Sequence, residues 1–136
     1  MSMDRWIKGL FIKKDFIPDN DDLYRRVLPL QFNPKKGKFT APSFMLRNDE
    51  NGLSVNWERY STPEESAICP VKPGKKYYVG GLYAKIPRNE QLEVNHEPTR
   101  NNKSHSLIIG KRLIESKYEV AEVLAENCRP LIINIT

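Results

Sequence analysis

The sequence has little cysteine and histidine and no long hydrophobic run. Its 136 residues include two cysteines, Cys69 and Cys128. A secreted domain of this size would carry a framework of four or more cysteines, so we expect two reduced thiols and a cytoplasmic protein. No stretch approaches the ~20 apolar residues that span a bilayer. Residues 1–16 also lack the apolar core of a signal peptide, so we expect no membrane association.

Motifs for cofactors, metals and complete catalytic triads are missing as well. The two histidines, His96 and His105, stand nine positions apart with Glu97 between them, which matches no common metal-ligand spacing. Three aspartates in residues 18–22 resemble the start of a calcium loop, but the glycine and the final glutamate of such a loop are absent. We therefore expect no metal and no cofactor.

The composition is that of a folded domain with a small positive charge. Six tyrosines, five phenylalanines and two tryptophans argue against disorder. The length predicts one domain over residues 1–136, with residues 1–18 as a peripheral segment. The net charge of +5 favours anionic partners through long-range attraction, although the lysines and arginines form separate small clusters along the chain.

Apolar spacing predicts an α+β fold with a mostly antiparallel sheet, a short N-terminal helix and a C-terminal amphipathic helix. The N-terminal helix is predicted from apolar residues at 6, 7, 10 and 11, and is expected to pack on its own domain. The C-terminal helix opens at Ser116 and ends before Pro130. Strands are predicted in residues 23–30, 43–47, 53–60, 76–86, 91–94 and 106–109, with residues 131–133 as a last strand or a buried tail.

Three local signals refine this fold. Asn51-Gly52 predicts a tight turn with a positive φ that joins residues 43–47 and 53–60 in a hairpin. Thr62, Pro63 and Glu65 predict a capping box at the start of a short helix. Gly80-Gly81 within a strand predicts a bulge or a close approach of another segment.

The candidate site residues are an arginine pair, a serine, an asparagine and a histidine. Arg25 and Arg26 lie on a predicted strand, where at most one of the two can face a site and bind phosphate or carboxylate; the alternative is an ordinary surface pair. Ser54 is predicted on the polar face of its strand. It lacks the Gly-x-Ser-x-Gly motif, which holds a nucleophilic serine in a strained, exposed turn. His105 is the candidate acid–base residue, and it is also expected, with Asn101, to bind the ligand. His96 is expected to be exposed.

Short motifs resemble two groups of proteins. Leu23-Tyr-Arg-Arg-Val27, Gly52-Leu-Ser-Val55, Thr62-Pro-Glu64 and the pattern Asn-x-x-Ser-His at 101–105 resemble small bacterial proteins of unknown function. The order of Tyr24-Arg25-Arg26 and Leu53-Ser54-Val55 is similar to that in ADP-ribosyltransferase-like toxins, in which such an arginine and serine help to hold a nicotinamide dinucleotide. The late catalytic glutamate of that family has no clear counterpart here.

Two functions follow as expectations. The first is a small bacterial cytosolic binding module that acts through a protein partner or an anionic ligand, because no full set of nucleophile, base and oxyanion donors is found. The alternative is an enzyme acting on nucleotides or phosphoesters, including a degenerate ADP-ribosyltransferase-like one, with Arg25 or Arg26 holding phosphate and His105 as acid–base. Tyrosines interleaved with lysines at 75–78 and 83–85 also keep nucleic acid open as a partner.

Overall fold

The computed structural model describes residues 4–7 and 10–133, and its centre is a six-stranded antiparallel sheet in the order β10-β7-β3-β6-β9-β8. Two further hairpins, β1-β2 and β4-β5, form separate two-stranded sheets. The strands are β1 (Asp4–Ile7), β2 (Leu10–Lys13), β3 (Asp22–Val27), β4 (Phe32–Asn33), β5 (Lys38–Phe39), β6 (Leu53–Trp57), β7 (Tyr78–Tyr83), β8 (Glu93–His96), β9 (His105–Ile109) and β10 (Arg129–Ile132). The prediction of an α+β domain with an antiparallel sheet is confirmed.

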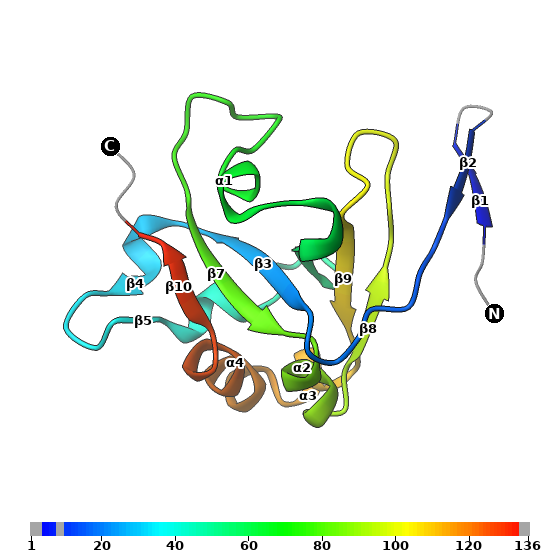
Figure 1. Cartoon of the computed structure of the whole chain (residues 1–136). Coiled ribbons are helices and arrows are strands. Elements are labelled where there is room, and N and C mark those ends of the chain that lie inside the picture. The colour runs from blue at the N-terminus through cyan, green and yellow to red at the C-terminus, as the bar shows by residue number, and fades with distance from the viewer. Residues whose placement is uncertain (1–3, 8–9, 134–136) are drawn as a thin grey trace.

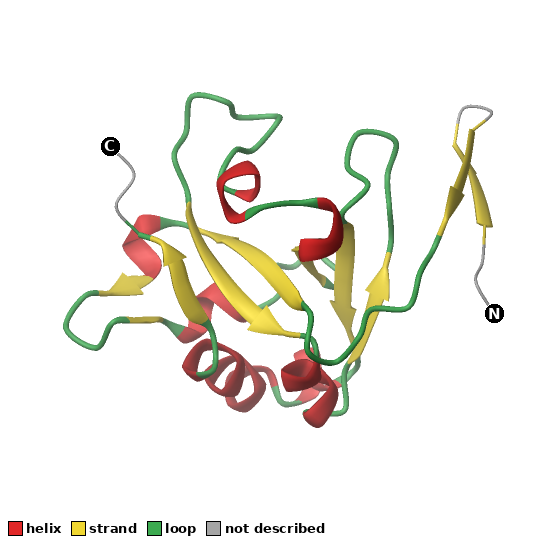
Figure 2. Cartoon of the chain, in the orientation of Figure 1, coloured by secondary structure: helices red, strands yellow, loops and turns green. Residues whose placement is uncertain are grey.

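Helices cover both faces of this sheet (Figure 1; Figure 2). The face that carries α4 is called the core face, and the face that carries α1 is called the outer face. The helices are α1 (Pro63–Ser66), α2 (Lys85–Asn89), α3 (Arg112–Glu115) and α4 (Lys117–Glu126), and the 3-10 turns are η1 (Pro29–Gln31), η2 (Ala41–Phe44) and η3 (Glu58–Tyr60).

Alternating burial along the strands defines these two faces. Leu53, Val55 and Trp57 of β6 are buried on the core face, where they belong to the same cluster as Val120 and Leu124 of α4. Burying these apolar side chains is the main source of the stability of the fold. A smaller buried cluster lies on the outer face and consists of Tyr24, Ala67 and Val79.

The N-terminal segment differs from its prediction. Residues 4–7 and 10–13 form the antiparallel hairpin β1-β2, in which Trp6 pairs with Phe11 and Ile7 with Leu10. The predicted N-terminal helix is therefore wrong. In Figure 1 the ribbon of the hairpin also stands away from the six-stranded sheet. The apolar spacing that suited a helical stripe equally suits two four-residue strands that pair with each other.

The predicted hairpin around Asn51-Gly52 is also wrong. Ser43 and Phe44 belong to the 3-10 turn η2, which has a proline in its first turn, and β6 pairs with β3 and β9 instead. Gly52 does not have a positive φ. A Cβ atom at this position would lie 2.6 Å from Cγ2 of Ile109, so the glycine is needed for the close approach of β9.

Three other local predictions are confirmed. Thr62 Oγ1 accepts from the amide of Glu65 at 3.1 Å, and the Glu65 carboxylate accepts from the amide of Thr62 at 3.0 Å, which completes the capping box of α1. The C-terminal amphipathic helix is α4. Gly80 and Gly81 lie where other segments approach β7, because a Cβ at Gly80 would meet Cys128 and Phe39.

Both cysteines are free thiols. Cys128 is buried behind β7, and burial raises the pKa of its thiol to about 12. Within the described ranges, no helix has the length and apolar character to cross a bilayer.

Candidate functional site

Ser54 and His105 lie beside each other on β6 and β9, on the outer face of the sheet. The register pairs Asn56 with His105 and Ser54 with Leu107, so the two side chains are diagonal neighbours. His105 Nε2 lies 3.4 Å from Ser54 Oγ, and His105 Nδ1 lies 2.8 Å from the backbone carbonyl oxygen of Glu97. The structure thus brings together the serine and the histidine that the sequence singles out.

These contacts fix the roles of the two ring nitrogens. A carbonyl oxygen only accepts, so Nδ1 carries the proton and donates to Glu97. In the neutral ring, Nε2 is then the acceptor, and it faces the hydroxyl of Ser54. A base held in one tautomer by a third group is the arrangement that activates a serine or a water molecule. The 3.4 Å separation is long, as such contacts often are before substrate binds.

A separate chain of hydrogen-bonded amide and hydroxyl groups lies beside this pair and leads toward α1. Asn56 Nδ2 donates to Ser66 Oγ at 3.0 Å, and Ser66 Oγ lies 2.9 Å from Ser61 Oγ. Asn102 Nδ2 donates to Asn56 Oδ1 at 2.9 Å. These contacts join β6, α1 and the loop before β9 into one rigid polar layer beside His105.

Asn101, the predicted ligand-binding asparagine, is exposed in the loop between β8 and β9. Its neighbour Asn102 makes the contacts that order this loop. The Oδ1 atom of Asn102 accepts from both the amide and the hydroxyl of Ser104. A side chain that holds its own loop in this way is typical of asparagine in turns.

Arg25 binds backbone carbonyl groups on the core side of the sheet. Its Nε donates to the carbonyl of Ser43 at 3.0 Å, and its Nη1 donates to the carbonyl of Ser54 at 2.8 Å. Burial lowers the pKa of the Arg25 guanidinium to about 10, so the group stays protonated at neutral pH. Arg25 therefore touches the backbone of Ser54, while the Ser54 side chain lies on the other face.

Arg26 points to the outer face and binds the C-terminal end of α1. Its Nε donates to the carbonyl of Ser66 at 2.8 Å, and its Nη2 donates to the carbonyl of Ile68 at 3.2 Å. The guanidinium also lies 5.8 Å from the ring centre of Tyr77. Both arginines thus fasten neighbouring segments to β3, from opposite faces as strand geometry requires.

His96 is a residue that the sequence prediction placed wrongly. Its side chain is 3% exposed rather than exposed, and its ring packs against Trp57 and Tyr60. Nδ1 accepts from the backbone amide of Asp15 at 3.0 Å, and Nε2 lies 2.8 Å from the carbonyl oxygen of Lys103. The strand pattern could have predicted this burial, because side chains two positions apart on a strand share a face and Val94 is buried.

His96 anchors the segment that precedes β3. The contact with Asp15 is joined by an ion pair of 2.8 Å between Lys14 and Glu97, and by a hydrogen bond of 3.2 Å from Tyr60 to Asp15. Burial and this hydrogen bond raise the pKa of Tyr60. The chain is therefore attached to β8 directly after the β1-β2 hairpin ends.

The tyrosines considered for base stacking contact cations of the protein itself. Tyr77 lies near Arg26 and Lys75. Tyr83 lies near Lys85, and the Arg129 guanidinium is 4.1 Å from its ring centre. These rings already have cation–π partners, which disfavours their use as open stacking surfaces for nucleic acid.

Among the residues that the structure describes, no group of three or more His, Cys, Asp or Glu side chains is arranged to hold a metal ion. Comparison with known proteins gives no further assignment: no family model, no curated protein and no solved structure matches this chain.

Proposed function

We propose that the protein is a binding module that docks onto a partner protein, and that the β1-β2 hairpin is its docking segment. The observation that carries this proposal is the position of the hairpin. Among the described residues, β1 and β2 pair only with each other, and their ribbon stands away from the six-stranded sheet and its helices (Figure 1).

The composition of the hairpin supports this role. Five of its eight strand residues are apolar: Trp6, Ile7, Leu10, Phe11 and Ile12. A two-stranded hairpin alone is only marginally stable in water, because it has no third layer to bury its apolar residues. A partner that covers one face of the hairpin supplies that layer.

The anchor behind the hairpin also supports docking. Asp15 is held by His96, and Ile17 is 1% exposed in the main core. The hairpin therefore leaves the body at a fixed place beside β8. A docking segment on a fixed base loses less entropy on binding than one on a free tail.

The test is native affinity purification of the full chain and of two full-length variants. Trp6→Ser combined with Phe11→Ser should lose a stoichiometric companion that the wild type retains. Leu30→Ser is the matched control, because Leu30 is an apolar residue that is 95% exposed elsewhere on the surface. A companion that stays bound to the hairpin variant would contradict the proposal.

A second function is favoured by the contact of Ser54 with His105. In this alternative the protein cleaves phosphoesters. His105 Nε2 removes the proton from Ser54 Oγ or from water as that oxygen attacks phosphorus, and then gives the proton to the leaving oxygen. Where Ser54 attacks, the phosphoryl group is carried on the serine, and a water molecule deprotonated by His105 then cleaves the Ser–O–P bond and restores the free hydroxyl. The assay is hydrolysis of bis(p-nitrophenyl) phosphate by the wild type, His105→Gln and Ser54→Ala.

The enzyme hypothesis expects His105→Gln to lower the rate by about 10²-fold or more, the usual size of general acid–base catalysis. The melting temperature should fall only slightly, because His105 is half-buried and the hydrogen bond from its Nδ1 to the Glu97 carbonyl contributes about 1 kcal/mol. A wild-type rate equal to that of buffer, or a loss that follows stability in both variants, would eliminate this function.

A further inference from the structure

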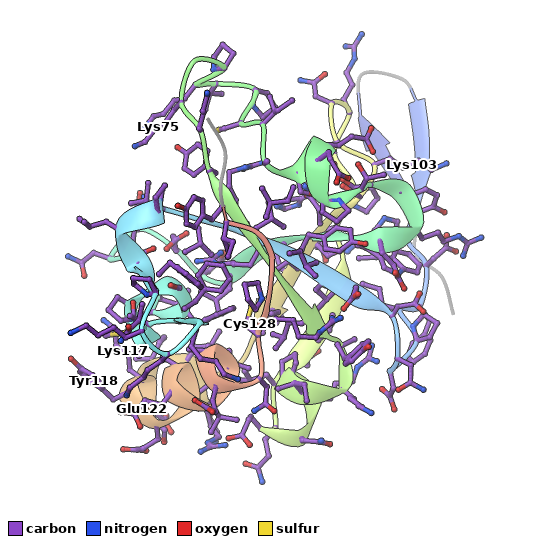
Figure 3. All side chains as sticks on the ribbon, turned by 60° about the vertical axis from the view of Figure 1, so that its left-hand side comes forward. Lys75, Lys103, Lys117, Tyr118, Glu122 and Cys128 are labelled. Carbon is purple, nitrogen blue, oxygen red and sulfur yellow. The ribbon has the colours of Figure 1, made fainter. Side chains whose placement is uncertain are left out.

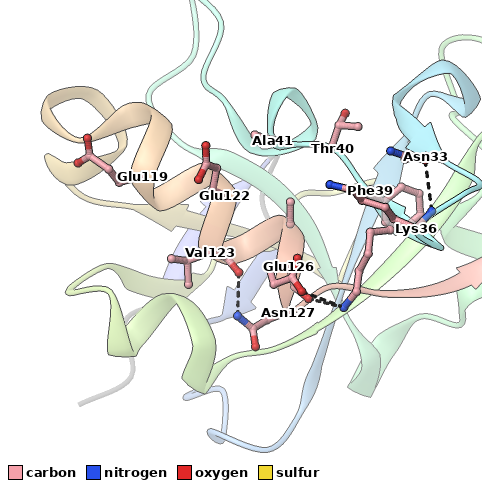
Figure 4. A pocket seen from close by; sticks show the side chains of 12 residues that line it. Asn33, Lys36, Phe39, Thr40, Ala41, Glu119, Glu122, Val123, Glu126 and Asn127 are labelled. Carbon is pink, nitrogen blue, oxygen red and sulfur yellow. Dashed lines mark hydrogen bonds and ion pairs between the residues drawn. The ribbon is translucent and has the colours of Figure 1, made fainter.

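A groove of about 840 Å³ runs between α4 and the β4-β5 hairpin (Figure 4). Its apolar part is formed by Phe39, Ala41 and Val123. Its α4 wall carries Glu119, Glu122 and Glu126, spaced so that all three share one side of the helix. The opposite wall carries Lys36 and Lys38, so the groove joins an apolar floor to one acidic and one basic wall, with three carboxylates against two ammonium groups.

Two of the three carboxylates on the α4 wall have no ion-pair partner within residues 14–133. Lys38 on the opposite wall binds Glu126, through the carbonyl oxygen at 2.7 Å and the carboxylate at 3.7 Å. Within residues 14–133, no ion pair involves Glu119 or Glu122. Both side chains are exposed, and Figure 3 shows Glu122 and the neighbouring Tyr118 pointing away from the body. A cationic segment with apolar residues is the complementary ligand.

The β1-β2 hairpin has this chemistry. Residues 1–13 contain Arg5, Lys8 and Lys13 against the single carboxylate of Asp4, a net charge of +2. The same segment contains the five apolar strand residues described above. Opposite charges attract the two surfaces over distance, and burial of apolar area supplies the affinity.

The hairpin cannot reach the groove of its own chain. It leaves the body beside β8, at one edge of the sheet, whereas α4 and β5, which form the groove on the core face, lie near β10 at the other edge (Figure 1). Strands are spaced by about 4.8 Å, so the width of six strands is about 24 Å. The segment from Lys14 to Ile17 is fixed at the β8 edge and does not span that width.

We infer that the partner of the hairpin is a second copy of this chain, with the hairpin of one copy in the α4–β5 groove of the next. This inference rests on the proposed docking function and specifies its partner. The contact joins two different surfaces, so it is head-to-tail. It produces a ring if the rotation between copies closes and an open chain if it does not.

The experiment measures molar mass by light scattering and sedimentation velocity over a wide range of protein concentration. The groove variant is Glu119→Lys with Glu122→Lys, and the hairpin variant is Trp6→Ser with Phe11→Ser. The matched control is Glu58→Lys with Glu64→Lys, which makes the same charge change at exposed positions of η3 and α1. Circular dichroism verifies that each variant is folded.

The wild type and the control should associate as concentration rises, and added salt should weaken the association. Each of the other variants should be monomeric alone. Mixed together they should form a one-to-one heterodimer, because the groove variant keeps an intact hairpin and the hairpin variant keeps an intact groove.

Two outcomes would overturn the inference. The first is a wild type that stays monomeric at every concentration. The second is a groove variant that associates like the wild type. If the protein is monomeric but still retains a different companion through its hairpin, the docking function stands and only the identity of the partner is wrong. If the hairpin retains no companion of any kind, both proposals fail.

Discussion

Arg25 Nη1 donates a hydrogen bond of 2.8 Å to the backbone carbonyl of Ser54, at the point where β3 and β6 stop pairing. The two strands share only two paired positions, Leu23 with Trp57 and Tyr24 with Asn56. Beyond these two positions the strands no longer pair, and the guanidinium of Arg25 connects β3 to β6 and also donates to the carbonyl of Ser43. One side chain thus replaces main-chain hydrogen bonds in the middle of the sheet.

Replacing Arg25 should therefore lower stability. Arg25→Met leaves the carbonyls of Ser43 and Ser54 without this donor, and we expect it to reduce the free energy of unfolding by about 2–3 kcal/mol. Arg25→Lys should recover little, because one ammonium does not reproduce the planar fork. Urea denaturation measures both variants. Full stability in Arg25→Met, together with lost binding of an anion, would instead identify Arg25 as a ligand residue.

Gly80 is predicted to reject even a methyl group. A Cβ there would meet the Cys128 sulfur, and it would lie 2.8 Å from Cε2 of Phe39. Gly80→Ala should cost about 1–3 kcal/mol of unfolding free energy, as overpacked cores do. Removing the sulfur with Cys128→Ala should recover part of that loss in the double variant. Gly74→Ala is the control, because nothing lies within 4 Å of its added Cβ. Equal effects at Gly80 and Gly74 would contradict the close packing described here.

Stability should fall at alkaline pH, in part through Cys128. Burial raises the pKa of its thiol from 9.0 to about 12, so the folded state holds the proton more tightly than the unfolded chain. This contribution is complete below pH 9 and is lost as pH rises toward 12. The slope of one proton is about 1.4 kcal/mol per pH unit at most. The free energy of unfolding, measured between pH 9 and 12, should fall less steeply with pH for Cys128→Ala than for the wild type. Identical slopes would show that the thiol of Cys128 does not have this raised pKa.

His96 should control the attachment of the segment before β3. His96→Phe keeps an aromatic ring against Trp57 and Tyr60 but removes the acceptor for the amide of Asp15. We expect the Asp15 amide to exchange its hydrogen about tenfold faster or more, because local opening becomes easier. Hydrogen exchange monitored by NMR measures this rate. Amides of β9 serve as the internal reference, and unchanged exchange at Asp15 would show that other contacts hold the segment.

Local signals in the sequence predicted local structure well. The capping box at Thr62 uses residues within one helical turn, so no distant contact competes with it. The alternation of apolar and polar residues predicted β6 for the same reason, because a strand with one buried face shows this pattern within its own residues. The predicted turn at Gly52 failed because the partners of β6 come from residues far away in the chain, which local turn chemistry does not encode.

The candidate site was predictable only in part. Ser54 and His105 were both named, but their contact depends on the register of β6 with β9, which single-sequence patterns do not give. The roles of Arg25 and Arg26 were hidden for a different reason. Their partners are backbone carbonyls, and a carbonyl is present at every residue, so no sequence pattern marks where one will be needed.

The order of the strands also bears on how the chain folds as it leaves the ribosome. β6, β9 and β8 derive from residues 53–109 and can pair once that stretch has been synthesised. β3 is made earlier and can pair first with β6 and then with β7, more than fifty residues later, whereas the outer edge of β7 stays open until β10 has emerged. Pairing over such distances is slow, so β7 is the strand most exposed to aggregation during synthesis.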